Sequence, residues 1–357
     1  MRPAILLLLT SVFVAACGDS AAPSAGEVHE PGLVRLEPVH FQENDSLYIG
    51  RVASFAVDPS DGSFFVSDSF WGRVLRFSPS GGLVQVYGSR GEGPGELKDP
   101  GPVEVGGDEV LVGDPGRSLL TRYAREDGAF LGSVRHEGYL TSIHADGETI
   151  WMGVQNRGRR TALASWSPGS DTVRYLGPLP DEFVQSSPLA GIYTGIQVAS
   201  WGDRLLVGFM GLNRLQLLDG DGSLVDTASV PARVRRGQMK DLVRRLPEME
   251  FPEMFAANSA LFRLHRLPRG SFALVHHDQT IEGDFIAADV YLSLLSGGLR
   301  ESCADRKVPV SADAQPYTAF RGDTLFVLQQ RVEGEKVTAF VDRYRIEDAG
   351  CFSGASE

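Results

Sequence analysis

The chain is short of basic residues and of long apolar runs. Its 34 Lys and Arg residues stand against 46 Asp and Glu residues, which gives a net charge of −12. This balance argues against nucleic acid as a partner, because phosphate binding needs a basic face. After the first 16 residues, no run is long and apolar enough to span a bilayer.

Motifs for catalysis and cofactor binding are also lacking. The sequence contains no Gly-x-Ser-x-Gly elbow, no His-Glu-x-x-His and no phosphate-binding loop. Helical periodicity is scarce, whereas the 41 glycines exceed the usual share of roughly 7% and suit a turn-rich all-β chain. We therefore name no catalytic residue and expect no cofactor.

The N-terminal segment 1–16 has the features of a lipoprotein signal peptide. Its apolar stretch is about the length of a signal-peptide core. Small residues then precede Cys17, which resembles the bacterial lipobox and implies cleavage before Cys17 and its lipidation. An ordinary signal peptide that contains a cysteine is the alternative. Because Gly18 is not Asp, the outer membrane is favoured if the cell has two membranes.

Two parts follow the signal segment. Residues 17–32 are rich in Gly, Ser, Ala, Pro and Glu, so they predict a flexible tether. Residues 33–357 are then left for the folded domain. Hydrophobic residues make up 42% of the chain, enough for a sizeable core.

An apolar strand that follows a turn with Gly, in most cases beside Asp, recurs six times. These six strands are expected at 63–68, 109–114, 148–153, 204–209, 271–276 and 324–329. Short strands, tight turns and a repeated unit are typical of a β-propeller. Strands before and after each repeat bring the unit to four, so we predict an all-β, six-bladed propeller of four-stranded blades.

The ring must be closed, because an open sheet edge invites aggregation. The sixth unit lacks a clear fourth strand, and 33–39 alternates as a strand, so we expect this N-terminal strand to complete the last blade. Cys303 and Cys351 are left as a pair in an exported chain, which favours a disulfide. Metal binding by these two cysteines, with no further ligand nearby, is the weaker alternative.

The extra spacing at 231–256 predicts a short helical insertion between blades four and five. Met239, Leu242, Val243 and Leu246 give it one apolar helical face. Its basic residues are Arg233, Arg235, Arg236, Lys240, Arg244 and Arg245. The insertion is either a short helix packed on the rim with its charged side in water, or a docking helix for an acidic partner.

The segment 64–100 resembles an NHL repeat, whose pattern is a strand ending in Asp, an Arg opening the next strand, Gly-rich turns and a Pro. The matching residues are Asp68, Arg73, Gly91, Gly93, Gly95 and Pro100. Asp114 and Arg117 continue the pattern in blade two, and it fades afterwards. The whole chain also resembles six-bladed propeller lipoproteins of bacteria, which implies a place in the cell envelope.

The turns between the second and third strands should gather on one face, which we predict to bind the ligand. Phe70 and Trp71 lie in such a turn, where an exposed aromatic side chain suits recognition and a rim-packed one fits equally well. The candidate residues of this face are Asp68, Phe70, Trp71, Arg73, Asp114, Arg117, Arg157, Asn213, His276, His277 and Gln329.

The sequence His276-His277-Asp278 is a candidate metal site, because we expect it at the end of a strand near the channel mouth. Neighbouring strand residues point to opposite faces, so the two histidines cannot share one metal without a bulge. Lactonase-like propellers hold a cation in the channel, but blades three and four here offer Val154 and Phe209. We therefore assign no metal and interpret these residues as rim polarity.

Together these features predict a membrane-anchored, non-catalytic propeller that binds a protein, peptide or glycan at the cell envelope. A metal-dependent, lactonase-like hydrolase or lyase is one alternative. A structural component of an envelope assembly is the other.

Overall fold

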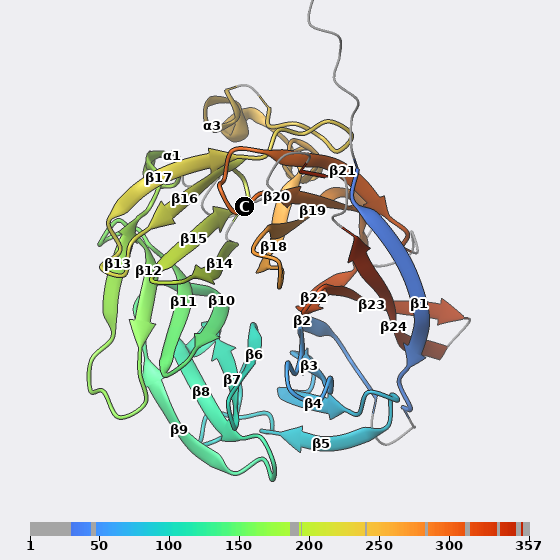
Figure 1. The fold of residues 1–357 in the computed structure, drawn as a ribbon. Coiled ribbons are helices and arrows are strands. Elements are labelled where there is room, and N and C mark those ends of the chain that lie inside the picture. The colour runs from blue at the N-terminus through green and yellow to red at the C-terminus, as the bar shows by residue number, and fades with distance from the viewer. Residues whose placement is uncertain are drawn as a thin grey trace, which may run out of the picture.

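The computed structural model describes residues 30–43, 48–185, 193, 195–239, 241–282, 285–310, 315–333, 336–347 and 351–352. Six antiparallel sheets of four strands each are arranged in a ring (Figure 1), so the predicted six-bladed propeller is confirmed. Cys17, the signal segment and most of the tether lie outside the described residues. No helix in the described ranges is long and apolar enough to cross a membrane.

The first three blades follow the chain from the innermost to the outermost strand. Blade one comprises β2 (Val52–Val57), β3 (Phe64–Asp68), β4 (Arg73–Phe77) and β5 (Leu83–Tyr87). Blade two comprises β6 (Val103–Gly106), β7 (Glu109–Asp114), β8 (Leu119–Ala124) and β9 (Phe130–Arg135), with the 3-10 helix η1 (Pro115–Arg117) after β7. Blade three comprises β10 (Tyr139–Asp146), β11 (Thr149–Asn156), β12 (Thr161–Trp166) and β13 (Arg174–Pro178).

The remaining blades complete the ring. Helix α1 (Asp181–Gln185) precedes blade four, which comprises β14 (Ile196–Trp201), β15 (Arg204–Phe209), β16 (Arg214–Leu218) and β17 (Leu224–Ser229). Blade five comprises β18 (Ala260–Arg266), β19 (Phe272–Glu282), β20 (Phe285–Leu295) and β21 (Ser302–Val308). Blade six comprises β22 (Tyr317–Arg321), β23 (Thr324–Glu333), β24 (Lys336–Glu347) and, from the other end of the domain, β1 (Gly32–His40).

The N-terminal strand closes the ring as predicted. β1 pairs antiparallel with β24, and Arg35 Nη2 lies 2.8 Å from Asp342 Oδ1 across that pair. Cys303 on β21 forms a disulfide with Cys351, 48 residues further along the chain, which confirms the expected pairing. The β1–β24 pairing and the disulfide each join the C-terminal part of the chain to a neighbouring element of the ring.

The hydrophobic core lies between adjacent blades rather than within any one of them. Phe65 and Tyr87 of blade one pack in one cluster with Val112 and Tyr123 of blade two. The second strand of each blade is buried on both faces, which is why these strands are the most continuously apolar segments of the sequence. The ring therefore depends on side-chain packing from blade to blade.

Blades five and six differ from the expected strand boundaries. β19 and β23 run for 11 and 10 residues, so His276, His277 and Gln329 lie within strands. The expected ends of these two strands, at residues 276 and 329, were therefore wrong. The reason is that the hairpins β19–β20 and β23–β24 keep pairing residue by residue well beyond the point where the other blades turn.

The insertion at 231–256 is helical only in short pieces, namely α3 (Leu242–Arg245), the 3-10 helix η2 (Leu246–Glu248) and α4 (Phe251–Ala256). Leu242 and Leu246 are buried in the core cluster of blade four, as the apolar pattern predicted. The charged side is not wholly in water, and here the prediction was wrong. Arg235 is buried, and the carboxylate of Asp305 compensates its charge by accepting the Nε–H at 3.0 Å. The same carboxylate accepts the backbone amide protons of 233–235.

The disulfide gives a first test of this fold. Replacing Cys303 and Cys351 together with Ala should lower the free energy of unfolding by about 2–4 kcal/mol, because the bridge closes a long loop in the unfolded chain. Urea unfolding would measure the loss. A reducing agent should destabilise the parent and leave the double variant unchanged. Equal stability of parent and variant would contradict a structural role for the bridge.

Candidate functional site: the central channel and its mouth

The central channel is lined by the innermost strand of each blade. In blades one, three and five this strand carries a β-bulge, and a polar residue follows the bulge. In all three blades the side chain of that residue bonds the backbone of the next blade. The three residues are Ser54, Ser142 and Arg263.

Two of these bonds are made by hydroxyl groups. Ser54 Oγ accepts the amide proton of Val103 in blade two at 3.3 Å. Ser142 donates its hydroxyl proton to the carbonyl of Ile196 in blade four. A short side chain is sufficient here, because a bulge brings the strand close to its neighbour.

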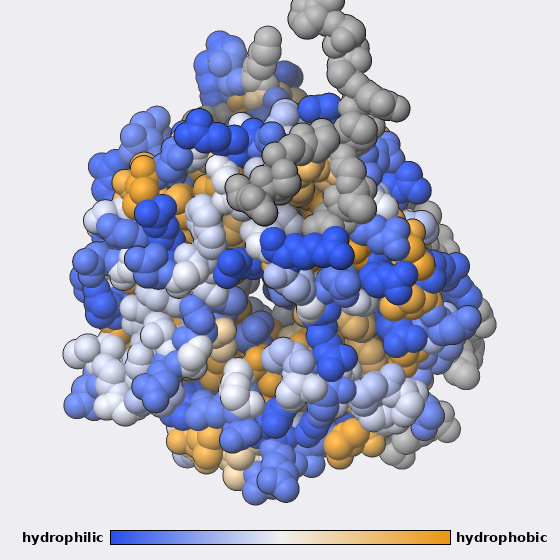
Figure 2. All heavy atoms as spheres, viewed as in Figure 1, coloured by the Kyte–Doolittle hydropathy of each residue, from blue (hydrophilic) through white to orange (hydrophobic). Residues whose placement is uncertain are grey.

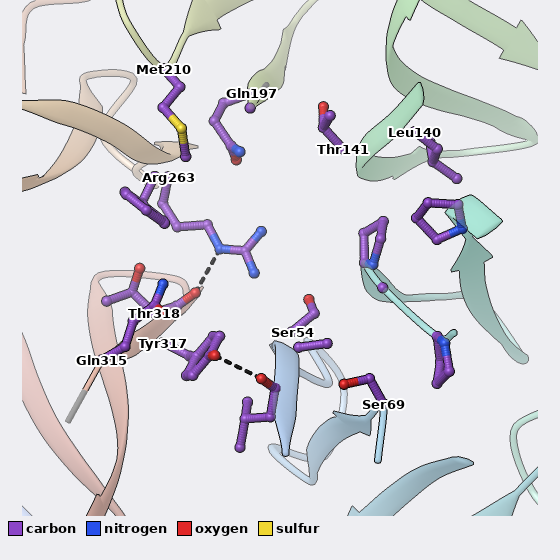
Figure 3. A pocket seen from close by; sticks show the side chains of 18 of the residues that line it. Ser54, Ser69, Leu140, Thr141, Gln197, Met210, Arg263, Gln315, Tyr317 and Thr318 are labelled. Carbon is purple, nitrogen blue, oxygen red and sulfur yellow. Dashed lines mark hydrogen bonds between the residues drawn. The ribbon is translucent and has the colours of Figure 1, made fainter. Parts of the chain in front are cut away.

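The third bond is made by a cation. Arg263 Nε donates to the carbonyl of Thr318 in blade six at 2.6 Å, and Nη2 donates to the carbonyl of Phe55 in blade one at 2.9 Å. Figure 3 shows the guanidinium extending from β18 into the space between the blades. The side chain at this position is neutral in blades one and three, whereas in blade five it places a positive charge inside the channel.

Two cavities meet at this cation. A mouth cavity of about 400 Å³ opens at one end of the channel, and a lower cavity of about 250 Å³ lies toward the other. Arg263 and Gln197 line both. The face of the ring seen in Figure 2 is mostly hydrophilic and has a hollow near its centre. The apolar part of the mouth wall includes Pro100, Pro102, Leu140, Met210, Phe262 and Tyr317.

The lower cavity contains Glu104, the carboxyl group whose charge acts on this cation among the residues that the structure describes. Burial raises the pKa of Glu104 to about 7, and the charge of Arg263 opposes that rise. Burial also lowers the pKa of Arg263, but an arginine stays protonated at neutral pH. Near pH 7 Glu104 is therefore only partly ionised, and the centre of the channel keeps part of its positive charge.

Two histidines line the same lower cavity. His144 Nε2 lies 2.9 Å from Ser200 Oγ, and His265 Nε2 lies 3.1 Å from the carbonyl oxygen of Gly322. Burial lowers the pKa of both, that of His265 to about 4. These rings are accordingly neutral hydrogen-bonding groups at neutral pH.

The acids predicted for the ligand face are buried. The carboxylate of Asp68 accepts the amide protons of Gly50 and Arg51, at 3.1 and 3.0 Å, and that of Asp114 accepts the amide proton of Lys98 at 2.8 Å. Each acid thus fastens the segment that leads into the innermost strand of its own blade. An Asp at a strand end commonly accepts amide protons in this way.

An aromatic cluster lies on the surface beside the mouth. Tyr48, Phe70 and Trp71 are 42%, 50% and 39% exposed. Trp71 packs edge to face against both neighbours, and the Arg73 guanidinium lies 5.6 Å from its ring centroid. Ser69, which lines the mouth cavity, directly precedes Phe70 in the chain, so the cluster begins one residue after the cavity wall.

Four other predicted residues hold parts of the rim and are spread around the ring. Arg117 Nη2 donates to the Glu92 carbonyl at 2.7 Å, and Gln329 donates to Asp342 at 2.6 Å beside the ring closure. The four residues are Arg117, Arg157, Asn213 and Gln329, and each bonds a neighbouring segment.

His276 and His277 are buried in β19 and point to different surroundings. His277 stacks on Phe262 at 4.1 Å between ring centroids, and Arg263 and burial lower its pKa to about 3. His276 faces Arg235 and Asp305, and burial lowers its pKa well below the usual range. The expectation that the two rings separate to opposite faces agrees with this arrangement.

The residues that sequence reasoning missed are Glu104, Gln197, Arg263 and Thr318. Their signal was weak, because polar residues scattered in short strands form no local motif that marks them as channel residues. Aligning the innermost strands of blades one, three and five would have found the cation. The aligned segments read Val-Ala-Ser-Phe, Leu-Thr-Ser-Ile and Leu-Phe-Arg-Leu.

Comparison with known proteins supports the fold. A protein of the DUF4221 family from Bacteroides vulgatus superposes with a TM-score of 0.67 and 10% identity, over 90% of this chain and 99% of its own. A protein from Bacteroides fragilis classed as exported gives 0.60 and 11%, over 88% and 95%. A catalytically inactive virginiamycin B lyase from Staphylococcus aureus gives 0.50 and 11%, over 87% and 99%. At these identities the likeness shows the fold alone.

Sequence comparison reaches less far. No protein-family model matches the chain. Peptidyl-glycine alpha-amidating monooxygenase A of Xenopus laevis is 25% identical over 109 residues, and the Rattus norvegicus enzyme is 26% identical over 133. These matches cover 29% and 32% of this chain but only 12% and 14% of the two enzymes. The NHL resemblance and the lipid anchor therefore stay predictions.

The carboxyl group in the channel makes a pH-dependent prediction. The pKa of Glu104 is higher in the folded state than in the unfolded chain. The free energy of unfolding therefore falls as the pH rises from about 5 to 8 and Glu104 ionises. Glu104→Gln should remove that loss. Relative to the parent, the variant should gain about 1–2 kcal/mol more at pH 8 than at pH 5, after allowance for solvent in the channel.

Denaturant unfolding of both proteins at the two pH values measures this difference. Comparison with the parent is necessary because buried histidines such as His265, whose pKa values are lowered, contribute the opposite slope in both proteins. An equal effect of the substitution at pH 5 and pH 8 would contradict the raised pKa.

Proposed function

We propose that this protein is a non-catalytic binding module of the bacterial cell envelope, anchored through a lipid on Cys17, with the outer membrane favoured where there are two. Its ligand is a protein, a peptide or a glycan, held on the mouth face of the propeller. The observation that carries the proposal is the exposed aromatic cluster of Tyr48, Phe70 and Trp71 beside an open cavity.

The aromatic cluster is suited to recognition for a physical reason. Large aromatic side chains bury much area on binding and lose little conformational entropy, which is why they dominate binding hot spots. The backbone that carries the cluster is held in place. Arg73 Nη2 donates to the Tyr48 carbonyl at 2.6 Å, and the Arg90 guanidinium bonds the Phe70 carbonyl. A prearranged surface binds with a smaller loss of entropy.

A metal-dependent, lactonase-like hydrolase or lyase is the alternative that the solved lyase structure raises. Such an enzyme needs several metal-binding side chains around the channel. Within the described part of the chain, no three His, Cys, Asp or Glu side chains gather in a way that could hold a metal ion. The channel centre offers Arg263 and a partly protonated Glu104, which suits binding of an anion better than binding of a cation.

A purely structural place in an envelope assembly is the second alternative. It requires no free ligand surface, whereas Phe70 and Trp71 are left open to solvent in the chain by itself. The two possibilities differ in whether a partner depends on those two side chains.

Crosslinking in cells that express the full-length lipoprotein tests the proposal. Phe70→Ala with Trp71→Ala should lower the yield of a recurrent crosslinked partner, identified by mass spectrometry, by about tenfold or more, as expected for truncated hot-spot residues. The matched control is Leu224→Ala with Val225→Ala, two residues with 48% and 47% exposure on the outer strand of blade four.

The outcome is clear either way. The control variant should retain the partner, and both variants should keep the parent's unfolding temperature because the altered side chains are exposed. A partner that both variants retain equally would overturn the proposed face.

A further inference from the structure

The mouth cavity reaches the guanidinium of Arg263, which can donate further hydrogen bonds. Arg263 uses two of its five N–H groups on the carbonyls of Phe55 and Thr318. Its guanidinium lies between the mouth cavity and the lower cavity, and its remaining N–H groups make no other bond within the described part of the chain. The geometry calls for a further acceptor from the mouth side.

The polar groups around this cation are also prepared for a ligand. Thr318 lines the mouth cavity and is 3% exposed, and its buried Oγ1 has no hydrogen-bond partner among the described residues. Burying a hydroxyl without a partner costs free energy, so a native structure rarely keeps one without a reason. Gln197, 8% exposed, directs its amide toward the same space in Figure 3.

The charge at this point matches one anionic group. Among the described residues, Glu104 is the carboxyl group whose charge acts on Arg263, and below pH 7 it is largely protonated. A single bound carboxylate would then neutralise the guanidinium, and its two oxygens fit a fork of N–H donors. Ionised Glu104 would compete with such a ligand.

The rest of the cavity limits what the anion is attached to. Leu140, Met210, Phe262 and Tyr317 form an apolar part of the wall together with a group of prolines, and this part suits an apolar body. The wall also contains the ion pair of Arg51 and Asp99, 3.9 Å apart, so the charges of these two side chains largely offset each other. A volume of about 400 Å³ lies in the ordinary range for small-molecule pockets and would hold one or two amino-acid residues.

We propose that the mouth cavity is a carboxylate-binding site, which takes an organic acid with an apolar body and holds its carboxylate on Arg263 beside Thr318 and Gln197. The C-terminal residue of a peptide and a free organic acid share this chemistry. The inference deepens the proposed function and rests on it, because it names the ligand group that enters the channel from the mouth face.

Direct binding to the purified full chain tests the site. The probes are N-acetyl-phenylalanine, which represents a peptide C-terminus, and 3-phenylpropionate, which represents a free acid, each compared with its primary amide. Isothermal titration or ligand-observed NMR should show at least one acid binding at least tenfold more tightly than its amide. The tighter acid identifies the source of the ligand, and two acids no better than their amides would overturn the proposal.

A pair of charge-matched variants locates the binding. Arg263→Gln should weaken the acid at least tenfold. The control is Arg266→Gln, which removes the same charge from an exposed position on the same strand and should change the affinity less than threefold. An equal loss in both variants would mean that net charge alone attracts the probe, and would overturn the site.

The pH dependence keeps the test valid if Arg263→Gln unfolds. In the parent, the acid should bind about tenfold more weakly at pH 8 than at pH 6, because only the protein with protonated Glu104 is competent to bind. Glu104→Gln should abolish this difference and retain tight binding at pH 8. A difference that persists in Glu104→Gln would contradict the arrangement.

Other titratable groups lie near this pair. His144 and His265 line the lower cavity together with Glu104, and the charge of Arg263 helps to lower the pKa of His277. Asp99 lines the mouth cavity and lies 3.9 Å from the guanidinium of Arg51. Burial lowers the pKa of all three histidines, whereas it raises the pKa of Tyr317 to about 12. A negative result with the acid probes can be distinguished from a failure of the proposed function. Crosslinking tests whether a partner depends on Trp71, whereas the binding experiment tests whether an acid depends on Arg263.

Discussion

The constraint on which the structure depends is the inner edge of each blade. Hydrogen bonding within a sheet stops at its innermost strand, so six strand edges face a common channel and would expose unpaired backbone groups there. The chain meets this constraint at alternate junctions with a bulge followed by a polar side chain that bonds the next blade. Ser54, Ser142 and Arg263 occupy these equivalent positions. Interblade packing and closure by β1 then hold the ring around that inner contact.

The channel acquires its chemistry through the third of these positions. A serine there would satisfy one neighbouring strand and leave the channel neutral, as it does in blades one and three. Arginine also bonds the neighbour but reaches further, to the Phe55 carbonyl in blade one, and leaves a cation facing an open cavity. Because Glu104 is only partly ionised near neutral pH, that charge is not fully compensated. Arg263 thus both connects neighbouring blades and provides the cation of the candidate binding site.

Much of the fold was predictable from the sequence, and most of the site was not. Six apolar strands after Gly-containing turns predicted the ring, and an alternating strand at the N-terminus predicted its closure. The two remaining cysteines favoured a disulfide over metal binding, and the structure contains that disulfide. The long hairpins of blades five and six were missed, because His276 and Gln329 are polar residues that tertiary pairing holds within strands. Arg263 and Glu104 escaped notice because an inward-facing polar residue in a short strand has no local pattern, and its meaning comes from the five other strands around it.

The most direct test of the central claim is a crystal structure with a brominated acid, 3-(4-bromophenyl)propionate, whose anomalous signal locates the ring. We expect the bromine in the mouth cavity near Phe262 and Tyr317, with the carboxylate within hydrogen-bonding distance of the Arg263 guanidinium. An acid bound only outside the channel, or one that directs its bromine toward Arg263 and its carboxylate to solvent, would contradict the account.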